Sequence, residues 1–168
     1  EPKRSEAGRL RIIKAMQPSF VHLRFHSEYS VTDGIVRLGP AIAKMKSWGI
    51  GAFGLTDLMN MFGSVRFYEQ CHKAGIKPIL GCDLWISNPS APASPYRLTV
   101  YCMNHDGYHS LCVLLTRAWL ENQVTKGRGE VKEEWLKGDG ARGLIALSAG
   151  PAGEIQTLFR NGKPAAAE

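Results

Sequence analysis

Three side chains that could bind or replace a metal ion alternate in the first apolar segment of the sequence. In the stretch His22-Leu-Arg24-Phe-His26, an extended strand would project all three to one side, because its side chains have a period of two. Imidazoles presented in this way suit a divalent metal ion, and a carboxylate such as Asp33 could complete the shell. Arginine at the middle position has no lone pair to donate and carries a permanent charge that repels a metal ion.

Carboxylates follow or interrupt two further apolar segments. Asp57 comes directly after one of them and Asp83 lies within the other. Asp57 could be a metal ligand, a base or a helix cap, and Asn60 could cap the next helix. Together with Asp33, these acids occupy corresponding places near strand ends, which is more suggestive of a shared metal site than any one of them alone. From the residues alone, metal binding and helix capping both remain open.

The elements that position these residues alternate between strand and helix. Short apolar runs predict strands, and apolar residues at helical spacing that end at glycine predict helices. This alternation predicts an α/β fold with a mainly parallel sheet or barrel, in which ligands gather at the carboxyl ends of the strands. The predicted strands are 20–25, 51–56, 77–86, 97–103 and 143–147, and the predicted helices are 39–48, 63–74, 106–122, 131–136 and 153–159.

Composition excludes several classes of protein. The 168 residues are 44% apolar, which suits one domain or part of one. No run approaches the roughly 18 to 20 apolar residues of a membrane span, so we expect a cytoplasmic protein without membrane contact.

Residues 1–15 hold five basic and two acidic residues, and thus half of the net charge of +6, which weakens the case for a DNA-binding surface. Four scattered cysteines predict free thiols.

Domain boundaries follow from the same pattern. Met16 stands just before the first apolar run, so we expect residues 1–15 to be an upstream or disordered extension and residues 16–168 to be the domain. The chain stops after Pro164, a residue well placed to open another helix, which predicts a domain truncated at its carboxyl end. A P-loop, a G-x-S-x-G elbow and a G-x-G-x-x-G fingerprint are missing from the sequence, so NTPase, serine hydrolase and dinucleotide-binding functions lose support.

Four motifs, in order, carry a family resemblance. They are FVHLRFHSEYSVTDG at 20–34, TDLMNMFG at 56–63, AGIKPILGCD at 74–83 and NHDGY at 104–108. Together they resemble the amino-terminal PHP domain of the alpha subunit of bacterial DNA polymerase III. The residues of the first motif favour the replicative type of this polymerase. The resemblance runs from about Met16 to the carboxyl end, and it implies part of a distorted (β/α)7 barrel.

The metal centre that the resemblance implies is altered here. Active PHP domains carry His-x-His in the first motif, Thr-Asp-His in the second and a glutamate in the third, and they bind up to three metal ions for phosphoester hydrolysis. In this sequence Arg24 stands where the first-motif histidine would be and Leu58 where the second-motif histidine would be. The loss of these two nitrogen ligands should prevent such a centre from binding its metal ions. Arg24 would then act as a built-in cation that pairs with the remaining acids. The predicted degenerate site consists of His26, Asp33, Asp57 and Asp83, with Arg24 and Leu58 replacing ligands and Asp83 standing for the glutamate.

The resemblance also implies a place in DNA replication. The parent protein would be a DNA-directed DNA polymerase, a nucleotidyltransferase that uses Mg²⁺ at paired carboxylates in a palm domain outside this segment. We expect the segment itself to contain no catalytic residue and no cofactor. It would be structural, would dock a proofreading exonuclease subunit and other replicase subunits, and would reach DNA through the parent protein.

Three alternatives stay open. An error-prone polymerase paralogue would share the motifs. A stand-alone PHP phosphoesterase, such as a histidinol-phosphatase-like enzyme, would keep the lost histidines. A module that contacts DNA through its basic charge would show strongly salt-dependent binding.

Overall fold

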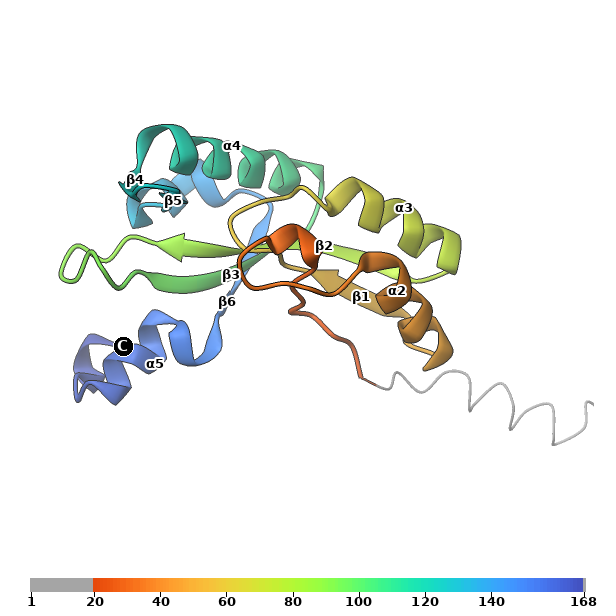
Figure 1. Cartoon of the computed structure of the whole chain (residues 1–168). Helices are drawn as coiled ribbons and strands as arrows, with labels where there is room; N and C mark the ends of the chain where they lie inside the picture. Colours follow the sequence, from red (N-terminus) through yellow and green to blue (C-terminus); the bar gives the residue numbers. More distant parts are fainter. Residues whose placement is uncertain (1–19, 168) are drawn as a thin grey trace, which may run out of the picture.

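A four-stranded sheet forms the centre of the computed structural model, which describes residues 20–167 (Figure 1). Its strand order is β1-β2-β3-β6. Strands β1 (Ala52–Leu55) and β2 (Lys77–Ile86) are parallel, because a helix connects them. Strand β3 (Tyr96–Cys102) is antiparallel to β2, since only a loop joins the two, and β6 (Leu144–Ser148) is antiparallel to β3.

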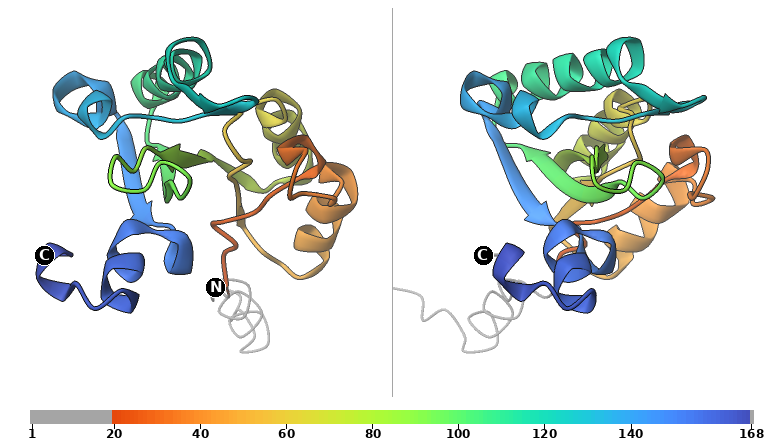
Figure 2. Two further views of the ribbon diagram at one scale, coloured as in Figure 1. Left: turned by 60° about the vertical axis from the view of Figure 1, so that its left-hand side comes forward. Right: turned by 90° about the vertical axis from the view of Figure 1, so that its left-hand side faces the viewer.

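Helices cover the sheet from different sides. Helices α2 (Leu38–Ser47) and α3 (Ser64–Ala74) pack beside β1 and β2, and α4 (His105–Glu121) lies above β3 (Figures 1 and 2). Helix α5 (Glu154–Arg160) lies on the side of the sheet opposite to α4 (Figure 2). The short elements are the 3-10 turns η1 (Glu28–Ser30), η2 (Glu133–Leu136), η3 (Gly138–Ala141), η4 (Gly150–Ala152) and η5 (Pro164–Ala166) and the hairpin strands β4 (Gln123–Thr125) and β5 (Arg128–Gly129).

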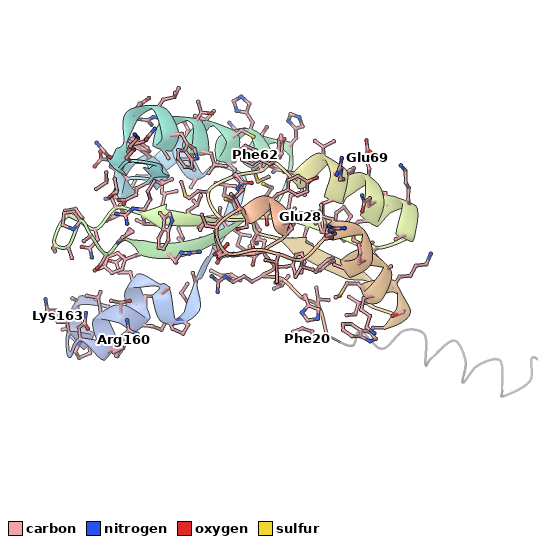
Figure 3. The ribbon with its side chains drawn as sticks, viewed as in Figure 1. Phe20, Glu28, Phe62, Glu69, Arg160 and Lys163 are labelled. Carbon is pink, nitrogen blue, oxygen red and sulfur yellow. The ribbon has the colours of Figure 1, made fainter. Side chains whose placement is uncertain are left out.

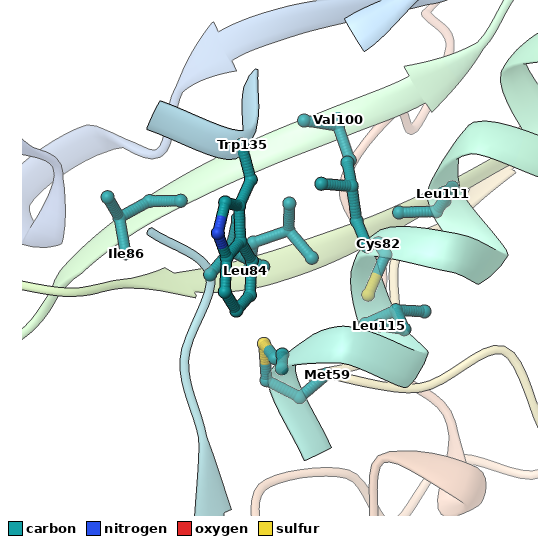
Figure 4. Close-up of a cluster of buried hydrophobic side chains, with 11 residues drawn as sticks. Met59, Cys82, Leu84, Ile86, Val100, Leu111, Leu115 and Trp135 are labelled. Carbon is teal, nitrogen blue, oxygen red and sulfur yellow. The ribbon is translucent and has the colours of Figure 1, made fainter. Parts of the chain in front are cut away.

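Two apolar clusters hold these layers together. One lies between α4 and strands β2 and β3, where Leu84 and Leu111 are fully buried and Trp135 closes the edge (Figure 4). The other joins α2, α3 and β1 through Phe53 and Phe67, whose rings lie 5.4 Å apart. Burial of such apolar area is the main favourable term in folding, so the sheet is fixed from two directions.

The α/β fold class predicted from the sequence is confirmed, and most element bounds agree within two residues. The predicted strand at 20–25 is wrong. This segment runs extended beside β1, where Gly54 N donates to His22 O (2.8 Å) and Thr56 N donates to Phe25 O (2.9 Å). The N–H of Phe25 bonds the Thr56 hydroxyl (3.0 Å) instead of a strand carbonyl, so no regular ladder forms.

Other differences concern strand direction and connections. The expectation of mainly parallel strands is wrong for the described sheet, in which β1–β2 is the only parallel pairing of named strands. The sheet is not a closed barrel. Residues 123–129 form the β4–β5 hairpin, which the polar sequence did not reveal, and residues 133–136 form a 3-10 turn where a short helix was expected. The predicted extension at 1–15 lies outside the described residues.

Two expectations from composition can be compared with the fold. All four cysteines are free. Within residues 20–167, every helix is too short or too polar to cross a bilayer.

Candidate functional site

The predicted site residues come from three segments that meet beside β2. Arg24 and His26 lie on the extended segment that precedes η1, and Asp33 lies in the turn that follows it. Asp83 lies within β2, and its side chain is fully buried. Because β1 and β2 are parallel, residues just after β1 reach the same place, and Leu58 forms an isolated bridge to Asp83.

Asp83 is the acceptor on which this cluster converges. Its Oδ2 accepts a hydrogen bond from Arg24 Nε (2.8 Å), and Arg24 Nη2 lies 2.6 Å from the same atom. His26 Nε2 lies 2.8 Å from that oxygen as well. The Thr99 hydroxyl donates to the other carboxylate oxygen, Oδ1. The lone pairs of Asp83 are therefore engaged by groups of the protein itself.

His26 lies between two carboxylates. Its Nδ1 is 3.0 Å from Asp33 Oδ1, while its Nε2 faces Asp83. A ring that donates from both nitrogens is an imidazolium. The hydrogen bond to Asp83 raises the pKa of His26, burial lowers it, and the negative charges of Asp83 and Asp33 raise it further, so that the net shift is upward. The two carboxylates thus favour the protonated, cationic form of this histidine.

The two acids are held in the ionised form by the same contacts. Burial raises the pKa of Asp83, but hydrogen bonds from His26, Arg24 and Thr99 outweigh it and the net pKa is lowered. The pKa of Asp33 is also lowered on balance. Burial raises it, whereas the Ser30 hydroxyl, which donates at 2.6 Å, and the neighbouring His26 lower it.

A second arginine, which sequence reasoning missed, completes the cluster. Arg97 Nη1 lies 3.5 Å from Asp83 Oδ2, and its Nη2 lies 3.6 Å from Asp33 Oδ2. The guanidinium also lies 3.8 Å from the centroid of the Trp85 ring, which faces it across the β2–β3 register. The sequence could have indicated Arg97, because an antiparallel pairing of residues 77–86 with 97–103 would place it near Asp83.

Asp57 and Leu58 do not join these contacts. Asp57 is 1% exposed, and its oxygens accept from Ser27 N (2.6 Å) and the Ser27 hydroxyl (2.8 Å). Burial raises its pKa, and the hydrogen bonds from Ser27 offset this only in part. Leu58 N donates to the Ser30 hydroxyl (2.9 Å), while its side chain packs against the apolar cluster between α4 and strands β2 and β3. The structure therefore brings together Arg24, His26, Asp33 and Asp83 of the predicted set.

The cluster does not fit a metal ion of the kind that PHP domains bind. A metal ligand must offer a free lone pair, yet both nitrogens of His26 face carboxylates and Asp83 already accepts from Arg24, His26 and Thr99. Across residues 20–167, His, Cys, Asp and Glu side chains nowhere form a group of three or more with a metal-binding arrangement.

An apolar groove of about 960 Å³ opens on the α4 side of the molecule. It lies between the turn after η1, the loop that follows β1, α4 and the β4–β5 hairpin. Phe62 and Leu120 line it and are 74% and 80% exposed. Figure 3 shows Phe62 near α4, far from Arg160 of α5. Large exposed apolar side chains around a groove are typical of an interaction surface.

Two residues with a positive φ line this groove. Val31 has φ 65 and ψ −54, and Thr32 N donates to Ser30 O at 2.7 Å, which defines a γ-turn. Met59 has φ 53. A positive φ is unusual for a residue other than glycine, and above all for a β-branched one such as Val31. Strain of this kind concentrates at functional sites, so the groove is a second candidate site.

Comparisons with known proteins give the context of these features. DNA polymerase III subunit alpha of Neisseria meningitidis is 42% identical over 151 residues, which cover 90% of this chain and 13% of the relative. The same subunit of Pseudomonas fluorescens is 43% identical over 155 residues, or 91% of this chain and 13% of the relative. A solved amidohydrolase from Chromobacterium violaceum has a TM-score of 0.48 and 17% identity, covering 60% of this chain and 33% of that chain.

The chain thus spans 13% of the length of these two curated relatives. The pattern of one family, the PHP domain, matches residues 22–168, which is most of the chain. The chain belongs to the PHP domain family.

Proposed function

We propose that this chain is the PHP part of a DNA polymerase III alpha subunit of the replicative type. The parent protein would be a cytoplasmic DNA-directed DNA polymerase that transfers nucleotides with the help of Mg²⁺ at residues outside this chain. The identity of 42 to 43% with two alpha subunits over 90 to 91% of the chain supports this assignment. Within that protein, the chain would be scaffold and docking surface rather than a hydrolase.

The contact of Arg24 with Asp83 carries the proposal that hydrolysis is lost. In PHP enzymes this region would gather metal ions, whereas here a guanidinium lies 2.6 to 2.8 Å from the buried carboxylate. Arg97 adds a second guanidinium next to Asp83, and His26 adds a further positive charge when it is protonated. A divalent cation placed among them would be repelled, and at Asp83 Oδ2 it would have to displace Arg24 and His26.

Metal analysis and a nuclease assay test this proposal together. The purified protein should contain no stoichiometric manganese, zinc or iron, and should not hydrolyse DNA ends or a chromogenic phosphodiester when manganese is added. A PHP phosphoesterase that retains both motif histidines, measured in parallel, provides the positive control. Stoichiometric metal together with hydrolysis that disappears when Asp83 is replaced by Asn would overturn it.

The apolar groove supports the docking role. Its walls expose Phe62 and Leu120, and it lies on the α4 side, opposite to α5 and to the described carboxyl end (Figures 1 and 3). A groove of this size accommodates a helix or an extended segment of a partner. We assign it to the proofreading exonuclease subunit, the partner that the resemblance implies.

Two matched aspartate variants test the docking surface. Phe62→Asp should weaken binding of the purified exonuclease subunit at least tenfold in calorimetry, because it places a charge in the groove. Phe159→Asp, at a phenylalanine of α5 that is 57% exposed, should leave the affinity unchanged. Equal affinities for both variants, or loss with Phe159→Asp alone, would refute this assignment.

A further inference from the structure

The positive charge of the described residues is concentrated on two neighbouring helices and their flanks. Residues 20–167 contain 16 lysines and arginines and 12 aspartates and glutamates, and ten of each kind lie outside residues 37–77. The acids within 37–77 are Asp57, which is buried, and Glu69, which alone offsets the basic residues at the surface of this range. The six basic residues, all exposed, are Arg37, Lys44, Lys46, Arg66, Lys73 and Lys77.

These six residues share one surface because α2 and α3 pack against each other. Buried side chains of both helices, such as Ile42 and Phe67, belong to one apolar cluster. The helices approach closely at Gly39, where an added Cβ would lie 3.7 Å from Gln70 Oε1. Figures 1 and 2 show α2 and α3 side by side on the β1 side of the sheet. Their exposed sides therefore form a continuous surface, which we call the basic face and define by the six residues above.

Five of the six cations have no acidic partner among residues 20–167. Arg37 is paired weakly, with its Nε 4.0 Å from Glu28 Oε2. Arg66 Nη1 donates to the hydroxyl of Tyr29 (2.7 Å), which leaves its charge uncompensated. Ordinary protein surfaces intersperse both signs of charge, whereas a surface of one sign attracts a ligand of the opposite sign.

Helix stability does not account for the whole arrangement. The carboxyl end of a helix carries partial negative charge, so cations in the last turn are favourable, which accounts for Lys44, Lys46 and Lys73. Arg37 is the N-cap of α2 and Arg66 lies in the first turn of α3, where the partial positive charge of the helix opposes them. Neither helix has an acidic residue in its first turn. These two arginines therefore act against helix stability, as expected of residues that serve binding.

Exposed aromatic rings lie among these cations. Trp48, just after α2, is 55% exposed, and Lys44 Nζ lies 5.0 Å from the centroid of its ring. Tyr68 of α3 is 48% exposed, and the ring of His72 lies 4.5 Å from its own. Basic residues that contact phosphates, together with aromatic rings on which bases stack, are the usual means of binding a single strand without sequence preference.

We propose that the basic face binds single-stranded nucleic acid, with its lysines and arginines against the phosphates and a base stacked on Trp48. A duplex would meet only the cations, because its bases are already stacked inside the helix. An acidic polypeptide would also match the charge but has no bases for Trp48. Binding here does not depend on the proposed function, since exonuclease docking uses the apolar groove, and none of the six residues lines that groove.

Lysine acetylation of the natural gene product that contains this chain reads the basic face directly. Oligothymidylate of 20 nucleotides, at saturation, should slow the acetylation of Lys46 and Lys73 at least threefold. Lys137 and Lys163, which are exposed outside the basic face, should react as they do without DNA. Unchanged acetylation of Lys46 and Lys73 would overturn the proposal, even if other segments of the product bind DNA. Equal protection by poly-glutamate, or by a duplex of the same length, would overturn the assignment to a single strand.

Two double variants with the same change of charge test the phosphate contacts, and the half-protection of Lys44 reports the affinity of this face. With Lys46→Gln/Lys73→Gln, the slope of log affinity against log salt concentration should become shallower by about 1.4, because each phosphate contact to a single strand contributes about 0.7. The control Lys137→Gln/Lys163→Gln should keep the slope of the unchanged protein. Trp48→Ala should weaken binding about fivefold or more through lost stacking. Equal slopes for both double variants, or full affinity of Trp48→Ala, would contradict this mode of binding.

Discussion

Replacement of Asp83 by Asn removes the charge on which the ion cluster depends. The side chain is fully buried, and Arg24, His26 and Arg97 all contact it. Removing one partner of a buried ion pair costs about 3–5 kcal/mol, because the remaining charges stay in a medium of low dielectric. Asparagine keeps the volume, so the loss is electrostatic. Against a total stability of about 5–15 kcal/mol for a domain, this is a large fraction.

Urea unfolding of this chain, followed by tryptophan fluorescence, measures the effect. With a slope of about 2 kcal/mol per molar urea, the midpoint should fall by about 2 M for Asp83→Asn. Arg24→Met should cost about 1 kcal/mol or less, because the Arg24 side chain is 46% exposed and solvent screens its charge. Glu121→Gln is the matched control at an exposed ion pair and should change stability by less than about 0.5 kcal/mol. A loss below about 1 kcal/mol for Asp83→Asn would refute the view that this carboxylate organises the site.

Three further predictions concern pH, packing and strain. Because the pKa of His26 is raised from 6.5, its stabilising charge is fully present below that value, and stability should fall as pH rises through the shifted pKa; His26→Gln should flatten this dependence of the urea midpoint. Gly107→Ala should destabilise the chain by about 1–3 kcal/mol in the same assay, since the added methyl group would overlap Gly143 O, whereas His109→Ala on the exposed side of α4 should have little effect. Val31→Gly should raise stability by about 1 kcal/mol, because glycine adopts the positive φ of the γ-turn without strain, and a drop in midpoint would contradict this.

The fold could be predicted from the sequence where local pattern decides structure. In α4, for example, Leu111, Leu114, Leu115 and Ala118 recur at helical spacing and are all buried. Strand direction could not be read in this way, because it depends on which elements connect the strands in space. The loop of residues 87–95 contains no helix, and recognising that would have predicted an antiparallel β2–β3 pair.

The sequence predicted which residues form the candidate site better than it predicted which of them contact one another. Arg24 and His26, which a period of two puts on one side, both contact Asp83, whereas the ring of His22, the third residue of that pattern, lies beside Phe20 and Phe53. Asp57 was grouped with them because it follows a strand, yet its hydrogen bonds go to Ser27, a neighbour that only the folded chain provides. Arg97 lies 14 residues beyond Asp83 in the sequence, and only the β2–β3 register brings it close.

The position of Arg24 in the cluster changes what the stability of this region depends on. A bound metal ion stabilises a fold in proportion to the logarithm of its free concentration relative to its dissociation constant, so starvation or chelation weakens the structure. The guanidinium that contacts Asp83 is attached to the chain, and its local concentration is set by covalent geometry. On the proposal that this cluster binds no metal ion, growth conditions that change the supply of manganese or zinc would leave the contact of Arg24 with Asp83 unaltered.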